Sequence, residues 1–286
     1  MILTQPIRWL GSKVRMRSKI LDIFKEIPHS LYVEPFGGSG AIFFGKEPEP
    51  SVYNDKNELL VNFMKTLRSE QGRRAITELA AVSPKSPVFY REFKEICKAF
   101  IKNEGLQELL TRANFADYPP ETAVAFAFFY VQNLSFGGIF LGSYGAEYCR
   151  DVQAQVYAYR NRIDALSLYA DKLRLTEIRN DDWRVIVENY DAQDRLFYFD
   201  PPYECKTSDD YKSGWTSDDT AELVETLLRL KASFVLSCYD GALYKPLEEI
   251  CEKKTFRAVT TCSRTARDKR SECVYIKNNN KARLFS

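Results

Sequence analysis

The first half of the chain alternates short apolar runs with segments whose apolar residues recur at helical spacing. Leu31–Pro35 and Ser51–Asp55 are each apolar enough to predict a strand, and Ala41–Lys46 between them is helix-like. Asn57–Arg68 places Leu59, Leu60, Phe63, Met64 and Leu67 on one face of a helix. A strand, a glycine turn, a helix, a strand and a second helix in this order predict an α/β fold with parallel strands.

The pattern changes between residues 69 and 147 and then returns to α/β character. This middle part predicts short helices at Val88–Phe100 and Thr122–Val131, followed by an aromatic, glycine-rich segment, 133–145. We therefore expect a catalytic domain formed by residues 1–68 and 148–286, and a smaller, mostly helical inserted domain, residues 69–147. The later predicted elements are helices at Val156–Asp171 and Thr220–Leu230, strands at Leu173–Ile178, Leu196–Phe199 and Ser233–Cys238, and a hairpin of Phe256–Cys262 with Cys273–Lys277.

Composition narrows the function classes. With 286 residues, 45% of them hydrophobic, the chain can bury a full core. It has a single histidine, His29, so a metal site with several histidines is excluded and Ser-His-Asp catalysis is disfavoured. Its seven cysteines have no CxxC spacing, which argues against a disulfide framework or a zinc ribbon. The longest apolar run is too short for a membrane span, and the N-terminal residues lack the apolar core of a signal peptide. We therefore expect a cytoplasmic protein that binds no metal and does not associate with a membrane.

The net charge of +2 conceals two basic regions. Residues 1–25 carry a net charge of +5 and residues 253–283 a net charge of +8, so the remainder of the chain is acidic. Clustered cations on an otherwise acidic protein indicate a surface for a polyanion, although a solvated surface face explains the charges equally well.

Two motifs follow predicted strands. The glycine turn Phe36-Gly37-Gly38-Ser39-Gly40 lies where open α/β sheets bind nucleosides, and Asp55 follows the next strand, where a carboxylate can accept ribose hydroxyls. Asp200-Pro201-Pro202-Tyr203 follows the apolar strand Leu196–Phe199. The prolines remove two backbone donors, which leaves the Asp200 carboxylate and a carbonyl as acceptors beside a tyrosine ring. This arrangement suits an aromatic ring with an amino group, whose nitrogen becomes nucleophilic when both hydrogens are bound.

In this order the motifs resemble the Dam-type DNA adenine amino-methyltransferases, in which the cofactor motif precedes the insert and the insert precedes Asp-Pro-Pro-Tyr. Residues 6–13, which include Trp9 and Lys13, resemble the family's N-terminal signature. Residues 129–138 resemble its aromatic insert segment, and Glu272 resembles a glutamate that precedes the last strand. Where the family often has an arginine, this chain has Leu134. The resemblance implies a Rossmann-like S-adenosylmethionine-dependent methyltransferase sheet, S-adenosyl-L-methionine as methyl donor and S-adenosyl-L-homocysteine as product.

The resemblance also implies roles for individual residues. The catalytic residues would be Asp200, Pro201, Pro202 and Tyr203. The donor would be bound by Trp9, Lys13, Phe36, Gly38, Gly40, Asp55, Asp182 and Asp200, with neighbouring Asp181 as an alternative to Asp182. Duplex DNA, with its target adenine flipped out, would be contacted by Asn133, Ser135, Phe136, Tyr144, Arg264, Arg267, Lys269 and Arg270. A cognate restriction endonuclease would be a partner in function only.

Other hypotheses remain open at this point. The same chemistry could act on the amino group of cytosine in DNA, on adenine in RNA, or on a side-chain amide. The chain could also be a DNA-binding protein that has kept the fold without catalysis. The aspartate at position 200 favours adenine in DNA, and the intact glycine turn and Asp200 argue against a non-catalytic protein. Methylation of a cytosine ring carbon is disfavoured because no cysteine follows a proline.

Overall fold

The structure is a computed structural model that describes residues 4–145, 152–202, 214–257 and 271–279. Among these residues the strands are β1 (Leu31–Glu34), β2 (Ser51–Asn54), β3 (Thr176–Arg179), β4 (Arg195–Phe199), β5 (Ser233–Tyr239), β6 (Glu252–Arg257) and β7 (Ser271–Lys277). The α-helices are α1 (Arg17–Lys25), α2 (Glu58–Arg68), α3 (Glu70–Val82), α4 (Pro87–Lys102), α5 (Leu106–Arg112), α6 (Pro120–Leu134), α7 (Val152–Asp164), α8 (Leu166–Lys172), α9 (Trp183–Tyr190) and α10 (Ser217–Arg229). Short 3-10 helices are η1 (Lys13–Arg15), η2 (Phe43–Gly45), η3 (Phe136–Gly138) and η5 (Ala242–Glu249).

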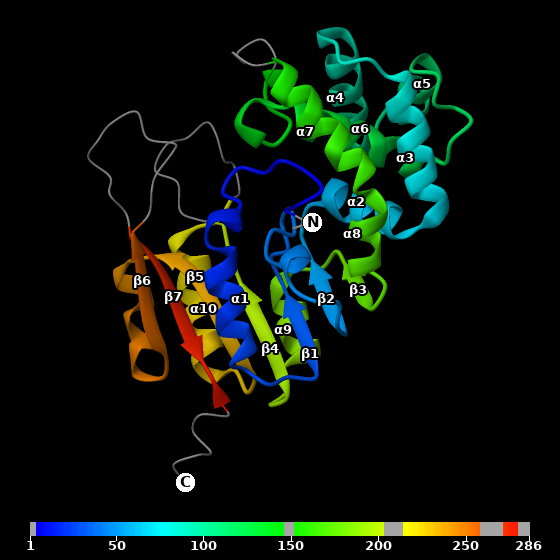
Figure 1. Ribbon diagram of the computed structural model, residues 1–286. Coiled ribbons are helices and arrows are strands. Elements are labelled where there is room, and N and C mark those ends of the chain that lie inside the picture. The colour runs from blue at the N-terminus through cyan, green and yellow to red at the C-terminus, as the bar shows by residue number, and fades with distance from the viewer. Residues whose placement is uncertain (1–3, 146–151, 203–213, 258–270, 280–286) are drawn as a thin grey trace. The chain divides into compact units, whose positions relative to one another are not determined.

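The strands form a seven-stranded sheet in the order β3-β2-β1-β4-β5-β7-β6 (Figure 1). β1 and β5 both pair in parallel with β4, whereas β7 runs antiparallel to β5 and β6. Helices alternate with the parallel strands along the chain, as the hydrophobic pattern predicts. The predicted Rossmann-like α/β fold is therefore confirmed.

By its internal contacts the chain divides into two compact units. Unit 1 contains residues 1–21, 37–49 and 53–182, and unit 2 contains residues 22–36, 50–52 and 183–286. The described residues of the predicted insert 69–147 lie within unit 1, together with α2, α7, α8 and β3 from the predicted catalytic part. Its role as a separate DNA-recognition domain stays a prediction.

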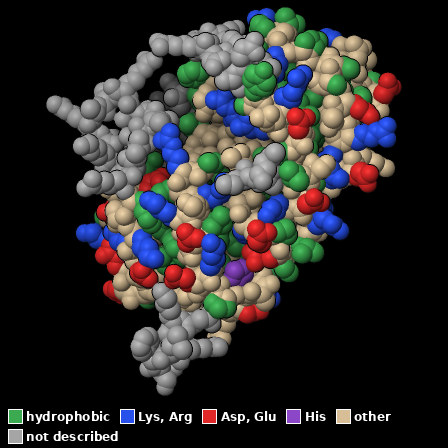
Figure 2. All heavy atoms as spheres, in the orientation of Figure 1, with side chains coloured by type: hydrophobic (Ala, Val, Ile, Leu, Met, Phe, Trp, Pro, Cys, Tyr) green, Lys and Arg blue, Asp and Glu red, His purple; other side chains and the backbone are tan. Residues whose placement is uncertain are grey.

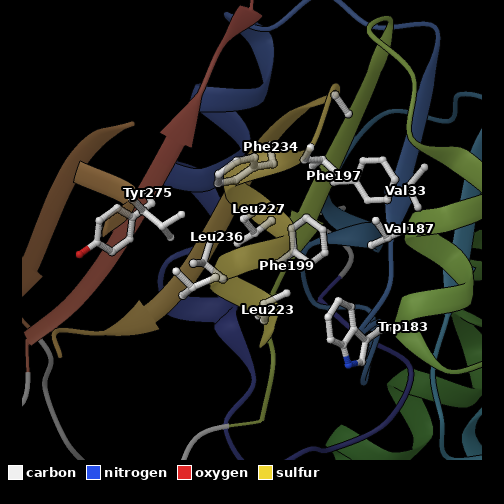
Figure 3. Packing of buried hydrophobic residues seen from close by; sticks show 14 of the residues in the cluster. Val33, Trp183, Val187, Phe197, Phe199, Leu223, Leu227, Phe234, Leu236 and Tyr275 are labelled. Atoms are coloured by element: carbon white, nitrogen blue, oxygen red, sulfur yellow. The ribbon is translucent and has the colours of Figure 1, made fainter. Parts of the chain in front are cut away.

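Unit 2 has its core on one face of the central strands. The side chains of β4 alternate between the two faces of the sheet. Phe197 and Phe199 point into a buried cluster that includes Val187 of α9 and Leu223 of α10 (Figure 3). Each such side chain stabilises the fold by roughly 1.5–3 kcal/mol through burial. On the opposite face Tyr198 packs against Phe24 at the end of α1.

Unit 1 is built around α6, whose residues from Ala123 to Leu134 are all buried. This helix packs against α2, α3 and α4. Because its apolar residues surround the whole helix instead of one face, α6 forms the core of unit 1. No helix within the described ranges is long and apolar enough to cross a bilayer.

Several elements differ from the sequence predictions. The predicted helix Ala41–Lys46 is only the 3-10 turn η2, because the left-handed Gly40 (φ 72°) precedes it and an extended Lys46 ends it. The predicted helix Val156–Asp171 is two helices, α7 and α8, because Ala165 has ψ near −1°, off the helical value. The predicted hairpin is present, but its first strand, β6, is Glu252–Arg257 and begins four residues before the predicted Phe256. The residues that connect its strands lie outside the described ranges.

Candidate active site

Asp200-Pro201-Pro202 begins where the buried strand β4 ends. Because side chains alternate along a strand, Asp200 projects from the same face as Tyr198. The Tyr198 hydroxyl lies 2.9 Å from Ser237 Oγ on the neighbouring strand β5. Burial, and after it the negative charge of Asp200, raises the pKa of Tyr198 well above its ordinary value. Tyr198 is therefore a neutral phenol near the Asp200 carboxylate, while Tyr203 lies outside the described residues.

Two further carboxylates of unit 2 lie close to the same phenol. Glu34 ends β1 and is buried, and Glu272 lies near the start of β7. Their negative charges also raise the pKa of Tyr198. The Tyr32 hydroxyl donates to Glu34 Oε2 at 2.7 Å. Glu34, Asp200 and Glu272 thus give this edge of the sheet a negative potential, which favours a cationic ligand.

Phe36 links the glycine turn to the strand that carries Asp200. Its ring centroid lies 6.5 Å from that of Phe199, the residue immediately before Asp200. It also lies 6.2 Å from the ring of Trp183 and 5.5 Å, edge-on, from the ring of Trp215. The start of the predicted cofactor turn and the start of the predicted catalytic motif therefore share one aromatic cluster within unit 2.

Trp183 brings a buried donor to this cluster. The residue is 5% exposed, and its Nε1–H has no hydrogen-bond partner among the described residues. Figure 3 shows the indole nitrogen directed away from the packed side chains of Val187 and Phe199. A buried N–H without an acceptor costs about 1–3 kcal/mol, so its retention is consistent with a ligand-binding role.

The glycine turn continues in unit 1 and is bonded to Asp55. The backbone N–H of Gly38 (φ 51°) donates to Asp55 Oδ2 at 2.8 Å, and that of Asn57 donates to Oδ1 at 2.8 Å. Burial raises the pKa of Asp55, and these two bonds lower it in part. At Gly40 (φ 72°) a Cβ would lie 2.5 Å from the Phe44 ring, so only glycine fits. The turn is therefore fixed by its backbone conformation and by the carboxylate predicted to bind ribose.

Trp9 and Lys13 lie in the N-terminal segment of the same unit. A Cβ at Gly38 would be 3.8 Å from Trp9 Nε1, so the indole borders the glycine turn. The Trp9 ring also packs against Phe140, at 5.9 Å between ring centroids. Lys13 is only 4% exposed, with its Nζ 3.5 Å from the carbonyl oxygen of Gly11. Lysine is seldom buried, so the burial of Lys13 argues against a solvated surface cation and favours a functional interpretation.

The two neighbouring aspartates, Asp181 and Asp182, differ in their bonding. Asp181 is held at three points: Arg179 Nε lies 2.6 Å from its carboxylate, and the Asn54 side chain bonds its backbone N–H and carbonyl at 2.8 and 3.0 Å. The Asp182 carboxylate has a looser ion pair, 3.6 Å from the exposed Lys56. These bonds of Asp181 hold the segment after β3 against the end of β2, and binding of the donor by Asp182 or by Asp181 stays a prediction.

Asn133 and Ser135, predicted to contact DNA, are buried in unit 1. Asn133 Oδ1 accepts the backbone N–H of Arg8 at 3.2 Å, and its Nδ2 donates to the carbonyls of Pro6 and Phe129. The Ser135 hydroxyl donates to the carbonyl of Gln132 at 3.1 Å. Asn133 therefore attaches the N-terminal segment to α6, and Ser135 bonds the last turn of that helix. A direct contact of either side chain with DNA stays a prediction.

Phe136 and Tyr144, the other two residues predicted to contact DNA, lie in the loop after α6. Phe136 is 49% exposed. Tyr144 is half-buried and packs against Tyr90 at 5.1 Å between ring centroids. The Lys94 ammonium and the Tyr90 hydroxyl both donate to the carbonyl of Gly142, which fixes the loop. Arg264, Arg267, Lys269 and Arg270 lie outside the described residues.

A comparison with protein families identifies the family of the chain. A family model described as D12 class N6 adenine-specific DNA methyltransferase matches residues 9–259. The chain belongs to this family. The matched range includes Trp9, the glycine turn, the insert and Asp200-Pro201-Pro202, so one family accounts for all of these motifs.

As a D12 class methyltransferase, the protein is an enzyme that methylates the N6 amino group of adenine in DNA. The resemblance predicted from the motif order is thereby confirmed. The hypotheses of cytosine, RNA or amide methylation and of a non-catalytic protein receive no support from the match.

Two residues that contact predicted site residues were not among the sequence predictions. Trp215 contacts Phe36 and is fixed by a bond from its Nε1 to Thr220 Oγ1 at 2.9 Å. A tryptophan immediately before the helix-capping residues Thr216 and Asp219 was the available signal. Arg8, whose guanidinium donates to the carbonyl of Ser135 at 3.2 Å, had no signal beyond its charge.

Proposed function

We propose that this D12 class enzyme uses S-adenosyl-L-methionine as its methyl donor and acts on an adenine that has left the DNA duplex. The observation that supports this most directly is the contact between Phe36 and Phe199. It joins the beginning of the glycine turn to the residue before Asp200 within one aromatic cluster. The donor-binding motif and the base-binding motif therefore start from the paired strands β1 and β4.

The residues of the site fit this donor. Asp55 would accept hydrogen bonds from the ribose hydroxyls, and Asp182 would accept one from the amino group of the cofactor's adenine. The Nε1–H of Trp183, which has no hydrogen-bond partner among the described residues, could donate to the cofactor. Gly38 and Gly40 let the backbone approach closely, and Trp9, Lys13 and Phe36 would border the donor. When bound, S-adenosyl-L-methionine supplies an electrophilic methyl group on a positively charged sulfur, and S-adenosyl-L-homocysteine is the product.

The base would be held by the motif after β4. The Asp200 carboxylate and a backbone carbonyl would accept the two hydrogens of the adenine amino group. Pro201 and Pro202 carry no N–H that could compete for those acceptors, and Tyr203 would stack on the ring. With both hydrogens bound, the nitrogen becomes pyramidal and its lone pair is available. Glu34 and Glu272 add negative potential that favours the positive charge appearing on that nitrogen.

The inserted helices and the basic regions would bind DNA. Base flipping requires that the flanking duplex be held firmly while one base is extruded. In the insert, the predicted contacts with DNA are Asn133, Ser135, Phe136 and Tyr144. The predicted contacts with phosphates are Arg264, Arg267, Lys269 and Arg270. A cognate endonuclease as partner in function, and a cytoplasmic location, accord with this proposal.

Methyl transfer measured on defined nucleic acids tests the proposal. The purified protein is incubated with methyl-labelled S-adenosyl-L-methionine and duplex DNA, and the DNA is digested to nucleosides. We expect label in 6-methyl-2′-deoxyadenosine and none in cytosine or in a control RNA. Label in methylcytosine, or no transfer from this donor, would refute the proposal.

A further inference from the structure

The N-terminal segment, residues 5–10, contacts the glycine turn of unit 1. The Ser39 hydroxyl, within that turn, donates to Gln5 Oε1 at 2.8 Å, and both residues are buried. Trp9 Nε1 borders the same turn, 3.8 Å from the position that a Cβ on Gly38 would take. Gln5 and Trp9 therefore both lie against the turn that is predicted to bind the donor.

The side chain of Gln132, in the last turn of α6, bonds this segment to the loop after α6. Its Nε2 donates to the carbonyl of Arg8 at 2.9 Å and to the carbonyl of Gly138 at 2.8 Å. Gln132 is fully buried, and its Oε1 has no hydrogen-bond partner among the described residues. The two carbonyls orient the amide, because only its nitrogen can donate to them. One buried amide thus joins the N-terminal segment to the loop.

Gly138 brings the backbone of the loop against that of Trp9. Its carbonyl also accepts the backbone N–H of Leu10 at 3.0 Å. Its φ is 73°, and a Cβ on it would lie 2.9 Å from the backbone nitrogen of Trp9. Gly137 also has a left-handed φ, 63°, but a Cβ on it would meet, beyond its chain neighbours, only Ile139 Cγ1 at 3.9 Å. Of the two glycines, only Gly138 is therefore required for the contact with Trp9.

The loop after α6 is closed by its own backbone bonds. Ser135 and Tyr144 form an isolated β-bridge, and the N–H of Phe136 donates to the carbonyl of Ser143 at 2.8 Å. A loop closed in this way keeps its shape. Phe136, which is predicted to contact DNA, and Gly138, which lies against Trp9, therefore hold a constant relation to each other.

Charge alone does not align DNA on the face of the molecule that carries α1. Among the described residues of this face, Figure 2 shows Lys and Arg side chains, in blue, interspersed with Asp and Glu side chains, in red. A surface of mixed charge gives no strong steering of DNA toward one place. The placement of a bound base relative to the donor therefore depends on bonded contacts such as those between the loop and the N-terminal segment.

We propose that Gln132 and Gly138 are positioning residues, which hold Trp9 against the glycine turn and so couple binding of the methyl donor to binding of DNA. The proposal rests on the proposed function, because it takes the loop to contact DNA and the turn to bind the donor. DNA that holds the loop in place also holds Trp9, so less freedom is lost when the donor binds beside it. By thermodynamic linkage, the donor strengthens DNA binding by the same factor.

The affinity for S-adenosyl-L-homocysteine, measured with and without DNA, tests this coupling. Calorimetry on the full-length protein is performed alone and in the presence of a saturating duplex that the wild type methylates. We expect the duplex to raise the wild-type affinity at least about 5-fold. In Gly138→Ala and in Gln132→Met we expect weaker binding and little effect of the duplex. Gly137→Ala is the matched control for Gly138→Ala and should keep the wild-type ratio of the two affinities.

Thermal unfolding of the variants separates positioning from loss of the fold. A variant that unfolds cooperatively but has lost the effect of the duplex supports the inference, and Gln132→Met carries the test if Gly138→Ala does not fold. An unchanged effect of the duplex in folded variants overturns the inference and leaves the proposed function standing. The same holds if the wild type methylates DNA but its donor affinity does not respond to the duplex. Absence of methyl transfer from S-adenosyl-L-methionine by the wild type overturns the proposed function, together with the inference that rests on it.

Discussion

The backbone N–H of Gly38 donates to the carboxylate of Asp55 at 2.8 Å, so the glycine turn and the end of β2 are one bonded unit. Both carboxylate oxygens of Asp55 accept a backbone hydrogen bond, since the N–H of Asn57 donates to Oδ1. A carboxylate fixed by two backbone donors is already oriented before a ligand arrives. This preorganisation lowers the entropic cost of binding a ribose.

The pKa of Asp55 leads to a pH prediction. Burial raises this pKa above the ordinary value of 3.8, so Asp55 takes up its proton at a higher pH than an exposed aspartate. Binding that requires the ionised carboxylate is complete above this raised pKa and is lost as the pH falls through it. We expect the affinity for S-adenosyl-L-homocysteine, measured by calorimetry, to fall on acidification. Asp55→Asn should bind more weakly and with little pH dependence.

Asp22→Asn is the control for Asp55→Asn, because Asp22 is an exposed aspartate paired with Lys25. It should leave both the affinity and its pH dependence unchanged. Equal pH dependence in the wild type and in Asp55→Asn would show that Asp55 does not bind the donor.

Gly40→Ala tests whether the turn depends on glycine. At φ 72° an alanine is strained, and its Cβ would meet the Phe44 ring at 2.5 Å. Gly105 is also left-handed (φ 63°), but an added Cβ there would meet no heavy atom within 4 Å. We expect Gly105→Ala to lower the free energy of unfolding by about 1–3 kcal/mol and Gly40→Ala to lower it by more. Urea denaturation measures both, and equal losses would mean that Phe44 yields easily.

Trp183→Phe keeps an aromatic ring beside Phe36 but removes the indole N–H. Because this N–H has no partner among the described residues, the free energy of unfolding should not fall. The affinity for S-adenosyl-L-homocysteine should fall several-fold if the N–H binds the donor. Trp215→Phe is the matched control, since its N–H donates to Thr220 and its loss should cost about 1 kcal/mol of stability. Unchanged donor affinity in Trp183→Phe would contradict the role proposed for Trp183.

Phe136→Ala tests the loop after α6. An exposed aromatic ring that stacks on a base contributes about 1–3 kcal/mol, so DNA binding should weaken by roughly 5- to 150-fold. Binding of S-adenosyl-L-homocysteine should be unchanged. Val82→Ala, at an exposed apolar residue at the end of α3, is the control. If both variants bind DNA like the wild type, Phe136 does not contact the bases.

The sheet was largely predictable because each strand is marked by an apolar run within its own segment of the sequence. The apolar runs of β1, β4 and β5, and the one-sided pattern of α2, specify strands and a helix within about two residues. The break at Ala165 was not predictable, because no glycine or proline marks it and buried residues continue through it. Such effects of the folded context override local propensity.

The site was predictable where function depends on a contiguous motif and not where it depends on packing. Asp200-Pro201-Pro202 and the glycine turn are both contiguous. Burial of Asn133 could not be read from the sequence, because it arises from bonds to Arg8 and Pro6, which lie 125 and 127 residues away along the chain. The contacts of Phe36 with Trp183 and Trp215 likewise join segments that are distant along the chain.

The central claim is that Asp200 binds the amino group that is methylated, and the rate of methyl transfer by Asp200→Ala tests it most directly. Single-turnover transfer to duplex DNA is measured beside the affinity for S-adenosyl-L-homocysteine, with Asp194→Ala, at the other end of β4, as the control. We predict a rate at least about 100-fold lower for Asp200→Ala, with the affinity largely kept and the control unaffected. A near-normal rate of adenine methylation by Asp200→Ala would contradict the account.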